Sequence, residues 1–219
     1  MSSTTAMPDP VPIRDAATVA VLRDGRGGGL EVLLLRRHAS HVFGAGADVF
    51  PGGAVDRDDV ELTRDADLTD GPWRMAALRE CFEEAGLLCA THDAKTADQI
   101  ADQRRALNAG RCDWRDVIDA LALELDLSMP VAFARWTTPP GPPKRYATRF
   151  YALAAPDEQC AQADGRETVA AEWMAPAAAL ADADAGRRWL MTPTRATLIQ
   201  LAHYRDTATA LAGLRTKAC

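Results

Sequence analysis

The chain has 219 residues and a mass of 23.6 kDa, and its content of 47% hydrophobic and 26% charged residues suits one large globular domain. A net charge of −6 and a pI near 5.2 argue against broad electrostatic binding of nucleic acid, although local arginines could still bind a small anion. No apolar run approaches the roughly 20 residues that cross a bilayer. We therefore expect a small-molecule partner, and neither nucleic acid nor membrane.

The N-terminal residues 1–14 lack the apolar stretch of a signal peptide and are predicted to form a disordered tail before a single domain over 15–215. The five cysteines are odd in number and contain no Cys-x-x-Cys pair. Reduced thiols in a cytoplasmic protein are the simplest expectation.

The first part of the domain is predicted to contain a β-hairpin and a glycine turn. Residues 16–23 and 30–37 are rich in strand-forming residues and flank the turn sequence 24–29. A short strand then runs into Pro51-Gly52-Gly53, where glycine lets the backbone approach a ligand or metal closely. The aspartate-rich segment 56–70 is polar and is predicted to be an excursion on the surface.

Three carboxylates gather on one face of the helix that is predicted next. At about 100° per residue, Glu80, Glu83 and Glu84 share one side of this helix, while the other side is apolar. Arg79 can pair with Glu83 one turn later. A solvated polar face is one interpretation. The other is a site for Mg²⁺ or Mn²⁺, because these cations prefer carboxylate oxygens.

Glycine and proline residues mark the ends of this helix and of later elements. Asp70-Gly71-Pro72 is suited to open the carboxylate helix, and Gly86 is suited to end it. Two helices, three strands and a closing helix are predicted after it. Their ranges are Thr96–Leu107 and Trp114–Leu125 for the two helices, Val131–Thr137, Ala147–Ala154 and Thr168–Met174 for the strands, and Thr194 to about Leu214 for the closing helix.

In the segment around the carboxylates the chain resembles the Nudix hydrolase family. The family's sequence box has an early Gly and Glu, followed by Arg-Glu-aliphatic-any-Glu-Glu-any-Gly-aliphatic. The matching residues are Gly53, Arg79, Glu80, Glu83, Glu84, Gly86 and Leu87. Cys81 stands at the first aliphatic position, and the spacing from Gly53 to Arg79 is twelve residues longer than in the family. The early Glu is absent; the ungapped position holds Asp59, one of three aspartates within 56–59, and the role of that Glu stays unassigned.

The resemblance implies an α/β fold of the Nudix type, an α/β/α sandwich with a mixed sheet and a helical insertion over the site at about 92–128. It also implies a hydrolase of phosphorus-containing acid anhydrides, with Mg²⁺ or Mn²⁺ held by Glu80, Glu83, Glu84 and the Gly53 carbonyl. Arg79 would hold Glu83 in place, so both are candidate catalytic residues. Nudix relatives are often homodimers, so a homodimer is expected.

A further carboxylate is expected on the loop before the strand at 168–174. Nudix enzymes commonly place a metal ligand or a base at this point, and Glu167 is the leading candidate catalytic residue there. Asp164 and Glu172 are the alternative residues, and a solvated loop acid is the alternative role.

Three arginines are candidate substrate-binding residues. Arg37 ends a strand that faces the glycine turn, and Arg145 and Arg149 lie at a strand after the turn Gly141-Pro142-Pro143. The planar guanidinium suits phosphate because it donates two hydrogen bonds at once. An ordinary exposed charge at a strand end is the competing interpretation.

Within the family, the chain resembles the peroxisomal-type coenzyme A diphosphatase branch and its bacterial relatives. The segments that carry this likeness are Val49–Gly53, Arg135–Pro139 and Arg145–Phe150. In the longer signature before Phe50, the residues that fit are Leu33, Leu34, Arg37 and Gly46, and those that depart are Leu35, His38 and Val42. The implied substrate is coenzyme A or an acyl-CoA. ADP-ribose, NADH or another nucleotide derivative is the alternative substrate, and a ligand sensor without catalysis is the alternative class.

Overall fold

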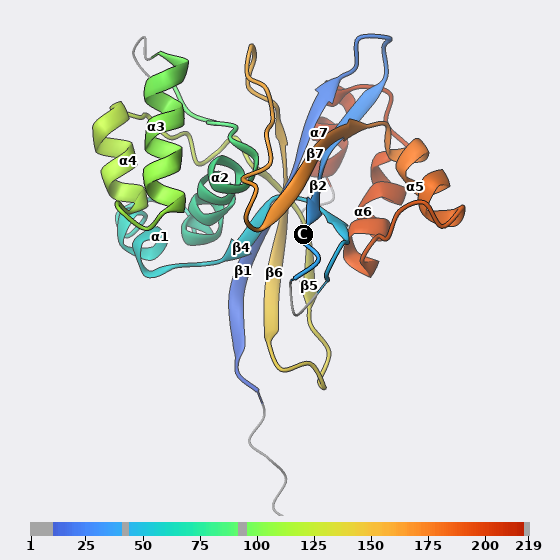
Figure 1. The fold of residues 1–219 in the computed structure, drawn as a ribbon, viewed down its shortest axis with the longest axis horizontal. Helices are drawn as coiled ribbons and strands as arrows, with labels where there is room; N and C mark the ends of the chain where they lie inside the picture. Colours follow the sequence, from blue (N-terminus) through green and yellow to red (C-terminus); the bar gives the residue numbers. More distant parts are fainter. Residues whose placement is uncertain (1–10, 41–43, 92–95, 217–219) are drawn as a thin grey trace, which may run out of the picture.

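The structure is a computed structural model that describes residues 11–40, 44–91 and 96–216. Within these residues a mixed seven-stranded sheet lies between helices on both faces, so the predicted α/β/α sandwich is confirmed (Figure 1). The strands are β1 (Ile13–Asp24), β2 (Leu30–Arg37), β3 (Asp48–Val49), β4 (Gly52–Ala54), β5 (Val131–Thr137), β6 (Arg145–Ala154) and β7 (Thr168–Met174). The helices are α1 (Arg57–Leu62), α2 (Gly71–Ala85), α3 (Ala97–Asn108), α4 (Trp114–Leu121), α5 (Pro176–Asp184), α6 (Thr192–Leu201) and α7 (Thr207–Arg215). None of the helices in this described part is long and apolar enough to cross a membrane.

Strand β1 organises the sheet around a fork. Along one edge it pairs in parallel with β6 over nearly its whole length. Along the other edge it pairs antiparallel with β2 only at its end, from Leu22 to Asp24, and with β4 near its start, from Ala16 to Thr18. The segment of β3 and β4 therefore fills the fork between β1 and β2, and this arrangement brings Gly53 beneath α2.

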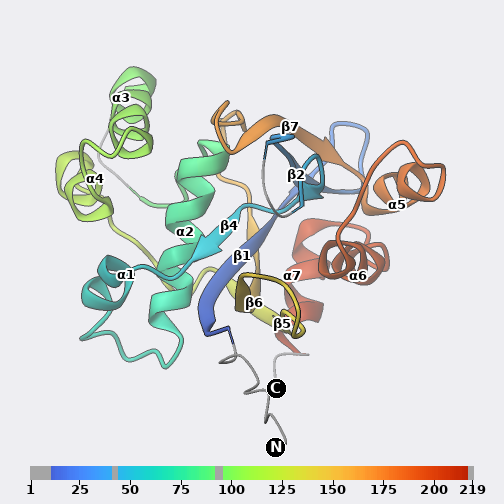
Figure 2. The same ribbon diagram turned by 60° about the horizontal axis from the view of Figure 1, so that its bottom comes forward.

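Apolar side chains cover both faces of the sheet, which explains why helices pack on each. Helix α2 covers one face, and α5, α6 and α7 cover the other (Figure 2). On the α2 face the core includes Ala77, Leu78, Cys81, Val19, Leu35 and Leu153. On the opposite face it includes Ala179, Leu198, Leu214, Leu22, Leu34 and Phe150.

Helices α3 and α4 lie beside α2 rather than on the sheet (Figure 2). Their contact is a third apolar cluster in which Trp114 of α4 packs against Phe82 of α2, with ring centroids 5.7 Å apart. The Trp114 indole N–H also points to the sulfur of Met75 at 3.2 Å. The predicted helical insertion is thus fixed to the flank of the carboxylate helix.

The hairpin and the three later strands are confirmed, but two helix boundaries are wrong. Helix α4 ends at Leu121, because Ala122 takes a left-handed conformation (φ 48°) and Glu124 then forms a β-bridge with Thr91. The predicted closing helix is two helices, α6 and α7. The second begins afresh because Asp206 caps it, accepting a hydrogen bond from the Thr209 N–H at 2.8 Å.

Two further differences from the prediction are an additional helix and an earlier start of the first strand. Helix α5 was not predicted, since its alanine-rich sequence has little periodicity. Strand β1 begins at Ile13, so the last two residues of the predicted tail belong to the sheet. Residues 1–10 of that tail, and Val42 of the coenzyme A signature, lie outside the described residues.

Candidate functional site

Helix α2 begins and ends where predicted, but the side chain of Asp70, which precedes it, does not cap the helix. Pro72 lies in the first turn, and Gly86 ends the helix with a left-handed φ of 71°. The Asp70 carboxylate instead accepts hydrogen bonds from Arg74 Nε at 2.7 Å and from the Tyr151 hydroxyl at 3.1 Å, which ties the start of α2 to β6.

Arg79 is the centre of the carboxylate face, and its side chain is only 7% exposed. Its Nη1 donates to Glu80 Oε1 at 2.8 Å and to Glu83 Oε1 at 3.0 Å, so the predicted pair with Glu83 is present. Its Nη2 donates to the Ala54 carbonyl at 2.9 Å, at the end of β4. One guanidinium therefore orients two glutamates and binds them to the β4 segment.

Most of the segment 56–70 is exposed, as predicted, but Asp59 on α1 has no exposed surface. The two Asp59 oxygens accept hydrogen bonds from Arg79 Nε at 3.1 Å and Arg79 Nη2 at 2.9 Å. Burial raises the pKa of the Asp59 carboxyl group, and Arg79 opposes that rise. The spacing of six residues after Gly53, which singled out Asp59 in the sequence, was thus a usable signal.

The two glycines before α2 are required by close approach rather than by a turn. Gly52 and Gly53 lie in strand β4, not in the predicted turn. A Cβ atom on Gly53 would lie 2.2 Å from Glu80 Oε1, and one on Gly52 would lie 2.5 Å from the Ala17 carbonyl oxygen. Because neither side chain exists, Glu80 reaches β4 and the Gly52 N–H donates to Glu84 Oε2 at 3.0 Å.

The glutamates of this face are crowded and poorly solvated. Burial raises the pKa of Glu80 to about 7, with the charge of Glu83 adding to the rise and Arg79 opposing it. Burial, and then the charge of Glu80, raise the pKa of Glu84 well above its usual range. Burial also raises the pKa of Glu83. Negative charge on this face is therefore costly unless a cation compensates it.

The three acids considered near β7 differ in the groups that they contact or influence. Its charge raises the pKa values of both Glu80 and Glu84. Asp164 instead accepts bonds from the backbone N–H groups of residues 166, 167 and 168 and shapes the loop. Glu172 is half exposed and pairs with Arg188. The structure thus separates a loop-shaping acid and a surface acid from Glu167.

The three candidate arginines lie at different distances from the carboxylates. Arg37 stands opposite Thr168 in the β2–β7 pairing, and its charge lowers the pKa of Glu84, so it is beside the site. Arg149 lies in the same row of the sheet as Gly53, because both pair with Ala17 of β1.

The two arginines of β6 also differ in their contacts. The Arg149 guanidinium stacks on the Trp73 ring of α2, 3.7 Å from its centre. Arg145 lies four residues earlier on β6, and its Nε donates to the Thr138 carbonyl at 3.1 Å. Arg145 therefore belongs to the β5–β6 hairpin and lies further along the strand from Gly53 than Arg149 does.

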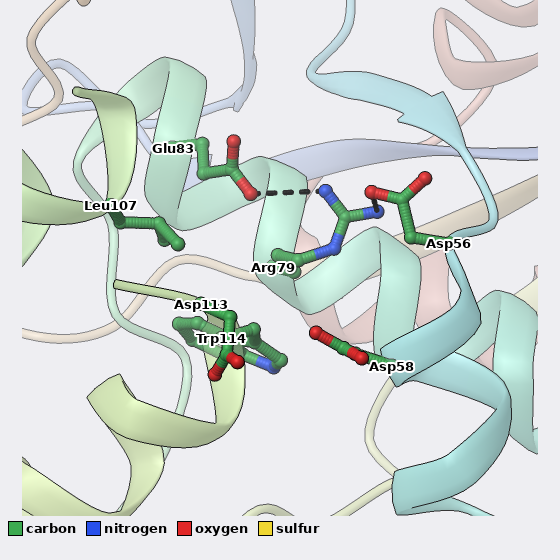
Figure 3. A pocket seen from close by; sticks show the side chains of 7 residues that line it. All are labelled: Asp56, Asp58, Arg79, Glu83, Leu107, Asp113 and Trp114. Atoms are coloured by element: carbon green, nitrogen blue, oxygen red, sulfur yellow. Dashed lines mark hydrogen bonds and ion pairs between the residues drawn. The ribbon is translucent and has the colours of Figure 1, made fainter. Parts of the chain in front are cut away.

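A cavity of about 190 Å³ opens on the insertion side of Arg79 and Glu83 (Figure 3). Figure 3 shows the Glu83 and Asp56 carboxylates on either side of the Arg79 guanidinium. The cavity is lined by Asp56, Asp58, Arg79, Glu83, Leu107, Asp113 and Trp114. Its walls come from α1, α2, α3 and α4, so the insertion contributes a surface beside the carboxylate face.

Two sets of contacts at this site carry no sequence motif. The Gly52 N–H that holds Glu84 is a backbone group, and no side-chain pattern reports it. Arg104 and Asn108 of α3 donate to the Glu83 carbonyl, but in the sequence they are two polar residues on an ordinary polar helix.

A sandwich whose central helix carries Arg-Glu-x-x-Glu-Glu against a Gly-Gly strand is the architecture of a Nudix domain, and the chain belongs to the Nudix hydrolase family. Residues 61–201 match the model of the NUDT19 Nudix domain, which agrees with the coenzyme A diphosphatase branch.

Individual relatives agree with this assignment. A crystal structure of a Nudix hydrolase from Alicyclobacillus acidocaldarius is 30% identical, with a TM-score of 0.81 over 92% of this chain and 96% of that chain. A Caenorhabditis elegans protein named "Putative nudix hydrolase 7" is 28% identical over 175 residues, which are 80% of this chain. The match spans 57% of that relative, a little over half of its length. The MutT protein from Methanosarcina mazei Go1 shares the fold, with a TM-score of 0.50 at 14% identity over 87% of this chain and 94% of that chain.

Proposed function

We propose that the protein is a metal-dependent pyrophosphohydrolase that cleaves a nucleoside diphosphate linked to another moiety, with coenzyme A or an acyl-CoA as its preferred substrate. The single observation that carries the proposal is the face of Glu80, Glu83 and Glu84 organised by Arg79 against Gly53. The family membership supports the same class of reaction.

The chemistry of this face fits a hard divalent cation such as Mg²⁺ or Mn²⁺. Raised pKa values at buried carboxylates mark a place where a cation relieves repulsion. Within the described residues no group of three or more His, Cys, Asp or Glu side chains is already arranged to hold a metal ion. Arg79 contacts Glu80 and Glu83 through one carboxylate oxygen each. Glu80, Glu83, Glu84 and the Gly53 carbonyl are the proposed ligands. The bound cation would neutralise the diphosphate and lower the pKa of a coordinated water.

The chain's own residues would orient the reaction and move its proton. Arg79 would keep Glu83 in one rotamer, as an outer partner of a ligand does in other metal sites. Glu167 would accept a proton from the attacking water. The new bond joins the water oxygen to one phosphorus, and the bond from that phosphorus to the bridging oxygen breaks. With coenzyme A the products would be adenosine 3′,5′-bisphosphate and 4′-phosphopantetheine.

The arginines would bind the anionic substrate in the order of their distance from the carboxylates. Arg37 is placed first, because its charge lowers the pKa of Glu84. Neighbouring strands are about 4.8 Å apart, so the shared row with Ala17 puts the backbone of Arg149 roughly 10 Å from Gly53. A substrate of several phosphate and ribose units can span that distance. Arg145 would contact a part of the substrate that lies further out.

The resemblance to the coenzyme A diphosphatase branch supports the substrate, and ADP-ribose, NADH or another nucleotide derivative is the second choice. A ligand sensor without catalysis is the third, and the three retained glutamates disfavour it. A homodimer and a cytoplasmic location remain part of the proposal; both come from the sequence.

The test is a substrate panel with purified protein and Mg²⁺ or Mn²⁺, in which coenzyme A, an acyl-CoA, ADP-ribose, NADH and a diadenosine polyphosphate are compared by product mass. We expect the highest kcat/KM for coenzyme A or acyl-CoA. Glu84→Gln keeps an oxygen for the Gly52 N–H but loses the charge, so it should abolish turnover while the circular dichroism spectrum stays unchanged. Full activity in EDTA would refute the metal site, and a tenfold preference for ADP-ribose would reverse the choice of substrate.

A further inference from the structure

The carbonyl groups in the last turn of α2 are all engaged, and most of their partners come from distant segments. The last four carbonyls of a helix lack partners within the helix and must find them elsewhere. The Phe82 carbonyl accepts from the Gly86 N–H at 3.0 Å, as a normal helix end would. The Ala85 carbonyl accepts from the Gln162 N–H at 2.8 Å, and the Glu84 carbonyl faces the Thr168 hydroxyl at 3.5 Å. Two partners thus come from the segment that leads into β7 and carries Glu167.

The remaining carbonyl, that of Glu83, is bound by the insertion. Arg104 donates to it through Nε at 3.1 Å and Nη2 at 2.9 Å, and Asn108 Nδ2 donates at 3.0 Å. Arg104 packs closely on the helix end, because a Cβ atom on Gly86 would lie 2.6 Å from Arg104 Nη1. The positive charge of Arg104 also interacts favourably with the negative, C-terminal end of the helix dipole.

The same two residues of α3 reach the segment before β7. Arg104 Nη2 donates to the Gln162 carbonyl at 2.8 Å. The Asn108 carbonyl accepts from the Arg166 guanidinium, and Arg166 directly precedes Glu167. The insertion, the end of the carboxylate helix and the Glu167 loop therefore meet at one junction, where Arg104 of the insertion donates to backbone carbonyls of the other two.

We propose that Arg104 is a positioning residue for hydrolysis: it fixes the Glu167 loop against the end of the carboxylate helix. This role rests on the proposed function, because Glu167 matters only if the site hydrolyses its substrate. The planar fork is essential to it, since one guanidinium donates to carbonyls on two different segments. The helical insertion is then part of the catalytic framework and not only a wall beside it.

The kinetic test compares Arg104→Ala and Arg104→Lys with Arg105→Ala. Arg105 is the matched control, because it is the next residue on α3 and, among the described residues, its side chain pairs only with Asp102 one turn away. Arg104→Ala should lower kcat by about tenfold with little change in KM, as expected for an outer partner of a reacting group. Arg104→Lys keeps the charge but not the fork and should recover little. Arg105→Ala should be unchanged.

A double-mutant cycle shows whether Arg104 acts through Glu167. In a Glu167→Gln background, Arg104→Ala should lower kcat less than twofold further, because the group it positions is already lost. An equal loss in both backgrounds would overturn the proposal. The proposal would also be overturned if Arg104→Ala lowers Tm but leaves kcat unchanged at a temperature where the variant and the wild type are both folded.

A measurement without turnover separates this inference from the proposed function. Hydrogen exchange of the backbone amides in 162–168 should be faster in Arg104→Ala than in Arg105→Ala. Unchanged protection of that segment overturns the positioning role even if the enzyme is active. If exchange is faster in Arg104→Ala but the wild-type protein hydrolyses none of the substrates in the panel, the proposed hydrolase function is refuted. The structural role of Arg104 at the junction would still hold.

Discussion

Asp59 and Arg79 form a bidentate ion pair beneath the carboxylate face, although twenty residues separate them in the chain. The pair joins α1, which is part of the lengthened segment between Gly53 and Arg79, to the helix that carries the glutamates. The longer spacing therefore does not remove an acid from the box. The added residues include the short helix α1, which places the buried Asp59 against Arg79.

Removing the charge of Asp59 should weaken both the fold and the site. Asp59→Asn leaves Arg79 buried with less compensation, and breaking a buried pair from one side costs about 3–5 kcal/mol. We expect a loss near 3 kcal/mol in urea unfolding, since Arg79 keeps Glu80 and Glu83, and a 10–100-fold loss of activity. Asp58→Asn on the same helix is the control and should change stability by less than 1 kcal/mol. Equal effects of the two substitutions would contradict the role of the pair.

Charge at Glu167 should matter for turnover and not for folding. Glu167→Gln should lower kcat by about 10²-fold with little change in KM, because proton transfer is a transition-state contribution. Asp164→Asn should instead lower Tm, since Asp164 accepts three backbone hydrogen bonds that shape the loop. Glu172→Gln, on the surface beside Arg188, should have neither effect. A sensitive Glu172 with an insensitive Glu167 would move the base to the other acid.

Arg149 should contribute to substrate binding through its position in the row of Gly53. Arg149→Ala is expected to raise KM for coenzyme A roughly tenfold, about 1.4 kcal/mol of binding, with kcat much less affected. Arg23 offers a matched control, because it also stacks on a tryptophan, with its guanidinium 4.3 Å from the Trp173 ring. If Arg23→Ala and Arg149→Ala change Tm alike and neither changes KM, Arg149 only packs on Trp73.

Local chemistry made the hairpin, the carboxylate helix and the three later strands predictable. The carboxylate helix has a proline in its first turn and a left-handed glycine at its end, both of which leave strong marks in sequence. The break between α6 and α7 was missed because an apolar spacing continues across it, and only the cap at Asp206 interrupts the helix. Helix α4 was predicted too long because the Thr91–Glu124 bridge is a tertiary contact.

The site divides in the same way. The spacing of Glu80, Glu83 and Glu84 on one helix is a local property, so their shared face was predictable. Their neighbours are set by the fold: Gly52 reaches Glu84 only because β4 fills the fork beside β1. Arg104 reaches the end of α2 only because α3 packs against its flank, and no periodicity reports such a contact.

Raising the pH without divalent metal should destabilise the folded protein. Burial raises the pKa of Glu80 to about 7, whereas a glutamate in an unfolded chain titrates near ~4.3. Between these values the folded state binds more protons than the unfolded state, so the free energy of unfolding falls as pH rises. The opposite contributions of Asp70 and Asp164, whose pKa values are lowered, vary mainly below about pH 4.

We therefore expect the free energy of unfolding in EDTA, measured with urea, to fall by roughly 1–3 kcal/mol between about pH 5 and pH 8. Saturating Mg²⁺ should recover most of this loss at pH 8, because a ligand that binds only the folded state stabilises it. Glu80→Gln cannot gain this charge, so its profile should be flatter and less sensitive to Mg²⁺. A wild-type profile that is flat or rises over this range would show that the carboxylate face carries its charge without a cation.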